Sequence, residues 1–295
     1  DSIDGGDGVD VIQIDNTVTD GTDFSATIGL AAVTNVERVV VKDADGGNSS
    51  GSPQTNTISV TFEGESTSGI DTDNSTDDDD VAITVDFSNI TDTDDTVTAT
   101  ANDIVDTDYS FTMLAGASAA SFTGSAGADT LTGGSAADSL DGNVGADVLT
   151  GGSGNDTFIF AEGDSTAAKT STITDFTSSS DKIQITLVAD ASGSTIDARD
   201  NGNAASISAG LSLLTVNDEG QYFFNEESNQ LVVDLDGNGL IQATDLIVNL
   251  TGETGVDSAD IDFTVTGGTG NNTIITGAGE GVSSSATASA ASASS

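Results

Sequence analysis

The sequence predicts an all-β protein, and three observations support this prediction. Apolar and polar residues alternate strictly in the segments 58–62, 81–87 and 109–113, which is the period of half-buried strands. Thr, Ser, Val and Ile dominate between recurrent clusters of Gly, Asp and Asn, as in strands joined by turns. No segment combines a helical apolar stripe with helix caps. The hydrophobic share of 35% and the single proline indicate a folded chain.

The composition excludes several classes of function. The chain has 49 acidic and 5 basic residues and a formal net charge of -44, which excludes a nucleic-acid binder and argues against docking on an anionic membrane. The absence of His and Cys excludes zinc thiolate sites, His-ligated metals, Ser-His-Asp and Cys-His nucleophiles, and disulfides. No stretch approaches the roughly 18 apolar residues of a membrane span, so no transmembrane segment is expected. Oxygen ligands remain, and they suit a hard cation such as calcium.

A nine-residue repeat carries this metal chemistry. Residues 124–159 read GSAGADTLT, GGSAADSLD, GNVGADVLT and GGSGNDTFI. Each unit divides into a Gly-rich turn of six residues and a strand of three. We expect the turn to direct a carboxylate and main-chain carbonyls at an ion, and the apolar residue two positions later to enter a narrow core between two sheets. The repeated carboxylates belong to Asp129, Asp138, Asp147 and Asp156.

This pattern resembles the RTX (repeats-in-toxin) family, whose nonapeptide G-G-x-G-x-D-x-U-x forms a calcium-bound parallel β-roll. The resemblance implies two nonapeptides per coil and an ion between turns two repeats apart. Asp129 would then share a site with the turn of Asp147, and Asp138 with the turn of Asp156.

The four units depart from the family pattern at three glycine positions, which carry Ser125, Ala136 and Asn143. Asn tolerates the left-handed backbone that such turns use, whereas Ala136 is expected to weaken one site.

Fragments of the same pattern lie near both ends of the sequence. Residues 5–13 read GGDGVDVIQ and place Asp10 nine residues after Asp1, so both aspartates are candidate calcium ligands. Residues 267–275 read GGTGNNTII, with Asn272 at the position of the carboxylate.

Residues 172–185 resemble the I-x-D-F-x-x-x-x-D-x-I segment that closes RTX β-rolls in secreted bacterial proteases and related exported proteins. The resemblance makes Asp175 and Asp181 candidate calcium ligands. The alternative, polar residues on the outer face of strands, explains the two aspartates equally well.

Residues 234–245, DLDGNGLIQATD, fit a 12-residue calcium loop. Asp234, Asp236, Asn238 and Asp245 would supply the ligands. The flanks look like strands rather than the helices of an EF-hand, so a hairpin turned by Asp-Gly-Asn-Gly is the alternative, and the two interpretations are compatible.

We expect five regions: a partial RTX repeat at 1–15, a β-rich domain with an acidic loop at 16–115, the RTX β-roll and closing strands at 116–190, a C-terminal β region with the Asp-Gly-Asn-Gly loop at 191–266, and a degenerate repeat with a Ser/Ala-rich tail at 267–295. The acidic run 71–80 is interpreted as a solvated loop, with the chelation of ions between neighbouring molecules as the alternative. The segment 35–41, NVERVVV, is similar to stretches of RTX-containing bacterial surface-layer proteins.

The expected function is that of a secreted calcium-binding structural protein. It would fold on binding calcium and self-assemble as a homo-oligomer or polymer into a bacterial surface layer or extracellular filament. The alternative is a calcium-dependent adhesin that binds surface glycans, and a less favoured one is the non-catalytic C-terminal part of an exported enzyme. No H-E-x-x-H or G-x-S-x-G motif is present, so we expect no enzymatic activity. The family resemblance implies one-step type I secretion.

Overall fold

The computed structural model divides into two compact units, Asp1–Asp156 and Thr157–Ser295. It describes residues 3–4, 10–16, 24–29, 33–34, 38–43, 57–63, 81–90, 93–104, 107, 109–188, 195–198, 200–214, 219–242, 245–266, 273–276, 281–285 and 292–294. The acidic run 71–80 lies outside these residues. The boundary between the units falls inside the predicted region 116–190.

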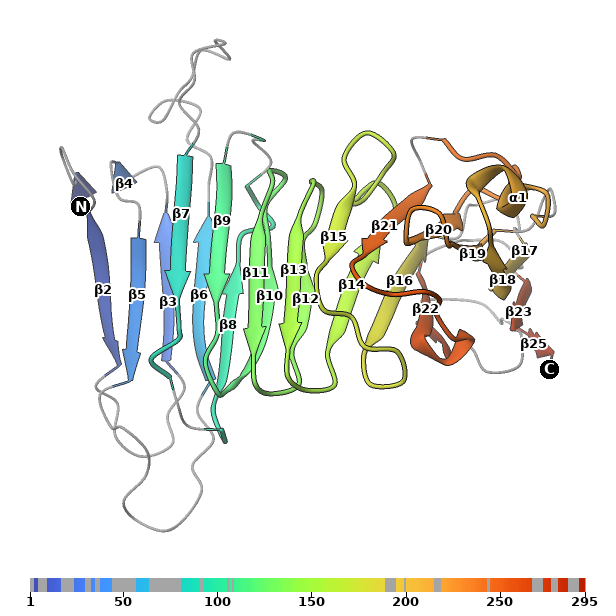
Figure 1. Cartoon of the computed structure of the whole chain (residues 1–295). Helices are drawn as coiled ribbons and strands as arrows, with labels where there is room; N and C mark the ends of the chain where they lie inside the picture. The colour runs from blue at the N-terminus through green and yellow to red at the C-terminus, as the bar shows by residue number, and fades with distance from the viewer. Residues whose placement is uncertain are drawn as a thin grey trace. The chain divides into compact units, whose positions relative to one another are not determined.

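The first unit is built from two layers of parallel strands (Figure 1). One layer has the order β2-β5-β7-β9-β11-β13 and the other the order β3-β6-β8-β10-β12, while β1 and β4 form a separate parallel pair. The strands are β1 (Ile3–Asp4), β2 (Val11–Asn16), β3 (Phe24–Gly29), β4 (Val33–Thr34), β5 (Arg38–Asp43), β6 (Thr57–Glu63), β7 (Val81–Asp86), β8 (Thr96–Thr100), β9 (Tyr109–Leu114), β10 (Ala119–Thr123), β11 (Thr130–Gly134), β12 (Ser139–Asp141) and β13 (Val148–Gly152). The predicted all-β fold with a parallel roll is therefore confirmed.

The core of the first unit consists of apolar side chains of the described strands that are buried between the two layers. In β9, β8 and β11 the buried and half-buried positions alternate without interruption, as the sequence alternation predicts. The parallel register aligns Met113 with Leu131 and Leu131 with Leu149, so one apolar ladder runs across β9, β11 and β13. Phe62 of β6 and Phe111 of β9 close the core from opposite layers, with their ring centroids 4.9 Å apart.

The number of residues between paired positions gives the length of one coil. Phe122 pairs with Leu140, as Leu131 pairs with Leu149, and each pair is separated by two nonapeptides in the sequence. One coil therefore takes two repeats, as the family resemblance implies. The coils that precede the repeats are longer, since Val85 pairs with Met113.

The second unit combines a parallel sheet with a mixed one. Its parallel sheet has the order β14-β16-β22-β24, and its mixed sheet the order β15-β21-β20-β19-β18, in which β19, β20 and β21 are antiparallel neighbours. A third, parallel sheet has the order β17-β23-β25. The strands are β14 (Thr157–Ala161), β15 (Ser171–Ile173), β16 (Lys182–Val188), β17 (Thr195–Ala198), β18 (Asp200–Ala204), β19 (Gln221–Asn225), β20 (Gln230–Asp234), β21 (Leu246–Leu250), β22 (Ile261–Thr266), β23 (Thr273–Thr276), β24 (Gly281–Ser285) and β25 (Ser292–Ser294).

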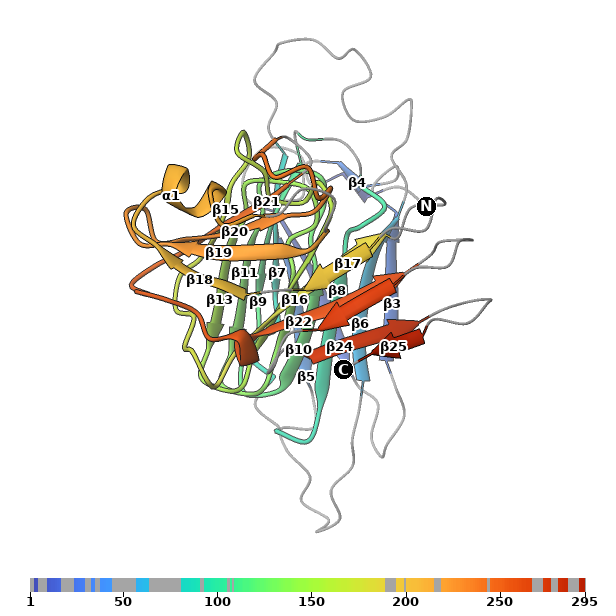
Figure 2. The same ribbon diagram turned by 90° about the vertical axis from the view of Figure 1, so that its right-hand side faces the viewer.

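Two short helices interrupt the strands of the second unit. The helix α1 (Ile207–Leu211) begins after Ser206, whose hydroxyl accepts the Ala209 N–H at 3.3 Å. It packs beside β18 and β19 (Figure 2), where Gly210 lies so close to the Phe223 ring that a Cβ atom would collide with it. A 3₁₀ turn (Ser258–Asp260) precedes β22. No described helix has the length and apolar character needed to cross a membrane.

The two faces of one strand give a direct test of the two-layer core. Leu149 is fully buried and its neighbour Val148 is 38% exposed on the opposite face of β13. We expect Leu149→Ala to lower the free energy of unfolding by about 2–5 kcal/mol, because it removes buried apolar contacts and leaves a cavity. Val148→Ala is the matched control and should stay within about 0.5 kcal/mol of the original protein. Urea unfolding at saturating calcium measures both, and equal losses would contradict this core.

Candidate calcium-binding turns

The four repeat carboxylates connect each coil to the coil before it. In every repeat one carboxylate oxygen accepts the main-chain N–H of the residue eighteen positions earlier in the sequence. The donor and acceptor pairs are Phe111 and Asp129 at 2.6 Å, Ala120 and Asp138 at 2.7 Å, Asp129 and Asp147 at 3.0 Å, and Asp138 and Asp156 at 2.9 Å. All four side chains are buried. The structure thus brings the four predicted residues into two columns, one on each edge of the roll.

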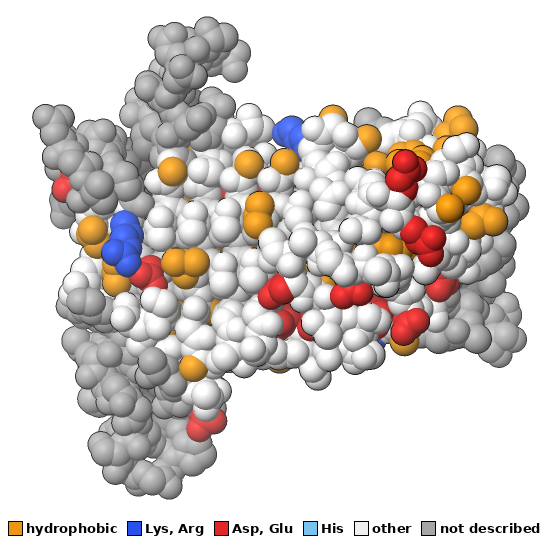
Figure 3. All heavy atoms as spheres, in the orientation of Figure 1, with side chains coloured by type: hydrophobic (Ala, Val, Ile, Leu, Met, Phe, Trp, Pro, Cys, Tyr) orange, Lys and Arg blue, Asp and Glu red, His pale blue; other side chains and the backbone are white. Residues whose placement is uncertain are grey.

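The first column contains Asp129 and Asp147, and the second contains Asp138 and Asp156, as the resemblance implies. Figure 3 shows few charged side chains over the strands of the first unit, and the four repeat carboxylates are buried. Each carboxylate also lies over the first glycine of its own repeat. At Gly133, for example, a Cβ atom would come within 2.7 Å of the Asp138 Cβ atom, so only glycine leaves room for the inward carboxylate.

Asp138 has a buried carboxylate oxygen that lacks a hydrogen-bond partner among the described residues and that a cation could bind. Its side chain is 3% exposed, its Oδ1 atom accepts the Ala120 N–H, and its Oδ2 atom has no hydrogen-bond partner among the described residues. A buried carboxylate oxygen without a partner is costly in free energy unless it is protonated or bound to a metal. Buried carboxylates beside main-chain carbonyls are the oxygen ligands that calcium prefers. The residues present therefore fit a calcium ion.

Burial raises the pKa of one carboxylate in each column. It raises the pKa of Asp138 to about 7, and the neighbouring charge of Asp156 acts in the same direction against the hydrogen bond from Ala120. Burial also raises the pKa of Asp129 to about 6, although hydrogen bonds from Phe111 and Ser125 oppose the shift. Both carboxylates resist ionisation in the absence of a positive charge.

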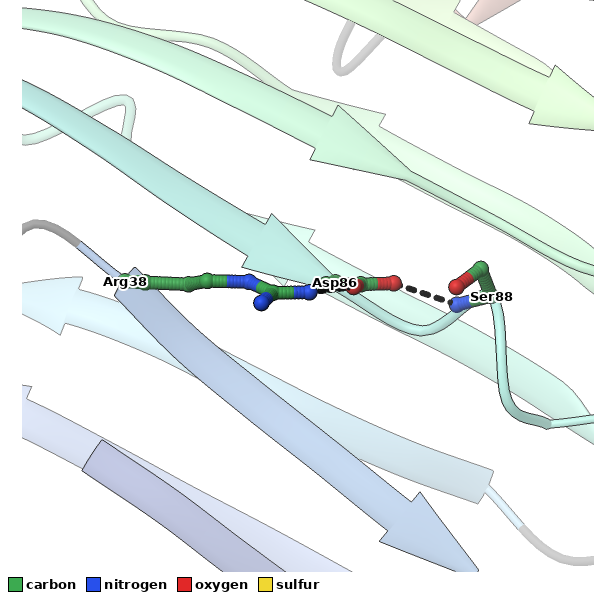
Figure 4. A network of polar contacts seen from close by, with 3 residues as sticks. All are labelled: Arg38, Asp86 and Ser88. Carbon is green, nitrogen blue, oxygen red and sulfur yellow. Dashed lines mark hydrogen bonds and ion pairs between the residues drawn. The ribbon is translucent and has the colours of Figure 1, made fainter. Parts of the chain in front are cut away.

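One ion pair is found among the described residues, and in it a basic side chain neutralises a buried carboxylate. Asp86 is buried at the end of β7, and Arg38 of the adjacent strand β5 forms an ion pair with its Oδ2 atom (Figure 4). The Ser88 N–H donates to Oδ1 at 2.9 Å. Burial raises the pKa of Asp86, but the hydrogen bonds from Ser88 and the charge of Arg38 outweigh burial and hold the pKa below its usual value. With 5 basic residues in the whole sequence, the chain cannot repeat this solution at every buried aspartate.

The loop 234–245 joins two antiparallel strands, β20 and β21, so the predicted hairpin is confirmed. It also gathers carboxylates: one oxygen from each of Asp234, Asp236 and Asp245 lies within 4.8 Å of the others. Asp234 and Asp245 are buried, and burial raises the pKa of both, aided by their neighbouring carboxylates. Asn238 contributes to the same loop by donating from Nδ2 to Asp236 at 2.6 Å. The arrangement can hold a hard cation, which is compatible with the hairpin.

Main-chain amides shape this hairpin loop before any ion is bound. Asp234 accepts the N–H groups of Gly237 and Gly239, each at 2.8 Å, and both glycines have positive φ, of 68° and 73°. Asp245 accepts the Leu235 N–H at 3.0 Å and so ties the end of the loop to its start. The loop conformation is therefore set by the same carboxylates that would bind a cation.

The remaining predicted ligands lie elsewhere. Asp10 is half-buried before β2, and its main-chain carbonyl accepts the Arg38 N–H at 3.2 Å. Asp1 lies outside the described residues. Asp175 is half-buried after β15, and Asp181 is buried and accepts the Thr177 N–H at 2.8 Å. Among the described residues, neither Asp175 nor Asp181 joins a group of three acidic side chains close enough to share an ion.

Comparison with known families decides the nature of the repeats. A sequence model of the RTX calcium-binding nonapeptide repeat, which spans four copies, matches residues 123–158 and 264–280. The chain carries RTX repeats. RTX repeats bind calcium, and the matched segments cover the predicted repeats from residue 124 to residue 158 and the degenerate copy at 267–275. A search of curated proteins gives no significant match.

Sequence reasoning missed two features of this part of the molecule. The pairing of Arg38 with Asp86 has no local signal, since 48 residues separate the partners. The hydroxyl of Ser125 lies within hydrogen-bonding distance of the Asp129 carboxylate, and here a signal was present, because Ser125 departs from the glycine of the RTX pattern.

The raised pKa values predict opposite effects of pH with and without calcium. In the folded chain without calcium, Asp138 has a pKa of about 7 and Asp129 a pKa of about 6. Above pH 3.8, the ordinary pKa of aspartate, the folded chain therefore keeps protons on these two side chains that the unfolded chain loses. Their stabilisation of the ion-free fold is complete below pH 3.8 and is lost as the pH rises through these values. The ion-free melting temperature should therefore be higher at about pH 5 than at about pH 8, whereas calcium, which needs ionised ligands, should reverse this order.

Differential scanning calorimetry in EGTA and in excess calcium measures this reversal. Asp138→Asn is the control, because it should reduce the pH dependence in EGTA relative to the original protein. An ion-free melting temperature that rises from about pH 5 to about pH 8 would show that these carboxylates are ionised without a metal.

The ion pair of Arg38 and Asp86 gives an independent prediction. Arg38→Ala should lower the free energy of unfolding by about 1–2 kcal/mol, a value reduced because the Arg38 side chain is 43% exposed. Asp86 has a lowered pKa, so the contribution of the pair is present above the ordinary pKa of 3.8 and is lost as the pH falls through the folded value. Urea unfolding with excess calcium measures the loss. Arg38→Lys keeps the positive charge and should lose less; an equal loss in both variants would contradict an electrostatic role.

Proposed function

We propose that this protein is a secreted structural protein whose RTX roll folds when calcium binds and whose subunits then assemble into an extracellular layer or filament. The observation that carries the proposal is the burial of the repeat carboxylates between coils, with a partnerless oxygen at Asp138. We assign the calcium ligands to the repeat carboxylates, with the carboxylates of the loop 234–245 as a second site. Asp10, Asp175 and Asp181 are weaker candidates.

Electrostatics links calcium to folding. With a net charge of -44 and 5 basic residues, ionised aspartates stacked in columns repel one another in a calcium-poor cell. In the calcium-rich medium outside the cell, each ion brings two positive charges and ties neighbouring coils together. A chain whose repeats lose their order without calcium suits the type I export that is typical of RTX proteins. We propose no catalytic role.

The self-assembly part of the proposal is supported by strand edges. Among the described residues β2 pairs with β5 and is the last strand of its sheet. Val11 on this strand is 50% exposed. The last strand of a sheet can pair with a strand of another chain, and the addition of a second copy in a head-to-tail manner would give a polymer. An adhesin that binds surface glycans is the second candidate, and it needs no such addition.

Circular dichroism tests the coupling of calcium to folding. The β signal of the full chain should fall in EGTA and return in millimolar calcium, because the repeat columns require the ion. Asp147→Ala should raise the calcium concentration at the midpoint of refolding. Asp79→Ala, in the acidic run outside the described residues, is the matched control and should change it less. A spectrum that is unchanged by EGTA would refute calcium-coupled folding.

Electron microscopy of the same samples separates the two assembly hypotheses. Layers or filaments that appear with calcium and disperse with EGTA would support self-assembly. Monomers at millimolar calcium that bind a glycan array only with calcium would favour the adhesin.

A further inference from the structure

The four RTX turns differ in backbone conformation at their second residue. Gly134, Asn143 and Gly152 have positive φ angles of 117°, 62° and 95°. Ser125 occupies the same position in the first repeat and is not among the described residues with positive φ. A serine avoids this region because of its Cβ atom, so the first turn follows a different path.

This different path directs Ser125 at the carboxylate of its own repeat. The Ser125 N–H donates to the Asp129 Oδ2 atom at 2.5 Å, and the Ser125 Oγ atom lies 3.2 Å from Oδ1 and 3.1 Å from Oδ2. Together with the Phe111 N–H, these groups give Asp129 partners at both oxygens. Ser125 is fully buried, so water does not compete for these contacts.

The Ser125 hydroxyl also reaches the neighbouring main chain. Its Oγ atom lies 3.4 Å from the Tyr109 carbonyl oxygen and accepts the Gly127 N–H at 3.2 Å. The hydroxyl therefore lies between a main-chain carbonyl and a carboxylate. These are two of the oxygen types that calcium joins in proteins.

Asp138 in the next repeat has no such group. Gly134, at the position equivalent to Ser125, has no side chain, and the Asp138 Oδ2 atom has no hydrogen-bond partner among the described residues. The two carboxylates are equally buried, at 1% and 3% exposure. The two carboxylates thus differ at their Oδ2 atoms: the amide and hydroxyl of Ser125 contact that of Asp129, whereas that of Asp138 has no partner among the described residues.

We infer that Ser125 closes the first RTX turn without calcium, so that Asp129 does not contribute to a calcium site and the ion-dependent part of the roll begins at Asp138. The inference rests on the proposed calcium binding by the repeat carboxylates and narrows it. The first turn then acts as an ion-independent cap on the calcium-dependent coils.

Calcium stoichiometry of the full chain tests this inference. Ser125→Gly should bind one more calcium ion per chain than the original protein, because it removes the hydroxyl from Asp129 and permits the positive φ of the other turns, which would turn the amide of residue 125 away from Asp129 Oδ2. Ser153→Gly, at an exposed turn position of the fourth repeat, is the control and should bind the original number. Asp129→Asn in the original protein should keep that number, and Asp129→Asn combined with Ser125→Gly should lose the added ion. Isothermal titration calorimetry and native mass spectrometry provide the counts.

Two results would overturn the inference: an Asp129→Asn protein that binds one ion fewer than the original, or a folded Ser125→Gly protein that binds the original number. If Ser125→Gly fails to fold, the count for Asp129→Asn alone decides. Asp138→Asn separates this inference from the proposed function, because an unchanged count and midpoint in that variant would contradict calcium binding by the repeats, whatever happens at Ser125.

Hydrogen exchange of the original protein in EGTA provides a second readout. The Phe111 and Ser125 amides, which donate to Asp129, should stay protected after calcium is removed. The Ala120 and Asp138 amides, which donate to carboxylates of the other column, should exchange at least tenfold faster than in calcium. Equal loss of protection at all four amides would contradict an ion-independent first turn.

Discussion

The roll depends on one interaction, the contact between a buried aspartate and the coil that precedes it. Each repeat carboxylate accepts the amide of a residue eighteen positions earlier, so the hydrogen bond that closes one turn also aligns two coils. The same geometry brings negative charges into columns inside a protein that has 5 basic residues. The fold therefore buries more carboxylates than its own basic side chains can neutralise.

The buried carboxylates are stabilised in different ways at different positions. Arg38 supplies the charge for Asp86, and a serine hydroxyl and amide supply neutral hydrogen bonds for Asp129. Asp138 has neither, and RTX repeats bind calcium. The hairpin loop 234–245 shows a related arrangement on antiparallel strands, in which amides hold three carboxylates close together. The buried acids are thus divided between internal partners and an external ion.

Much of this arrangement could be predicted from the sequence because it is local and periodic. The nine-residue spacing identified the four aspartates and the residues that form the ladder, and alternation identified β6, β7 and β9. The pair of Arg38 and Asp86 could not be predicted, since it depends on the length of the coils between β5 and β7. The short helix α1 also escaped prediction, because a five-residue segment shows too little periodicity. The backbone path at Ser125 could not be predicted either, since the sequence shows the substitution but not the direction of the amide.

The hydrogen bonds between the coils all point the same way. In the four repeats a carboxylate accepts an amide of the preceding coil. A stack of such coils therefore has a direction, as a helix does. Asp129, for example, accepts the Phe111 amide of the preceding coil with its carboxylate and donates its own amide to Asp147 of the following coil. The two sides of a coil are therefore chemically different: one side presents carboxylate acceptors to the preceding coil, and the other presents amide donors to the following coil.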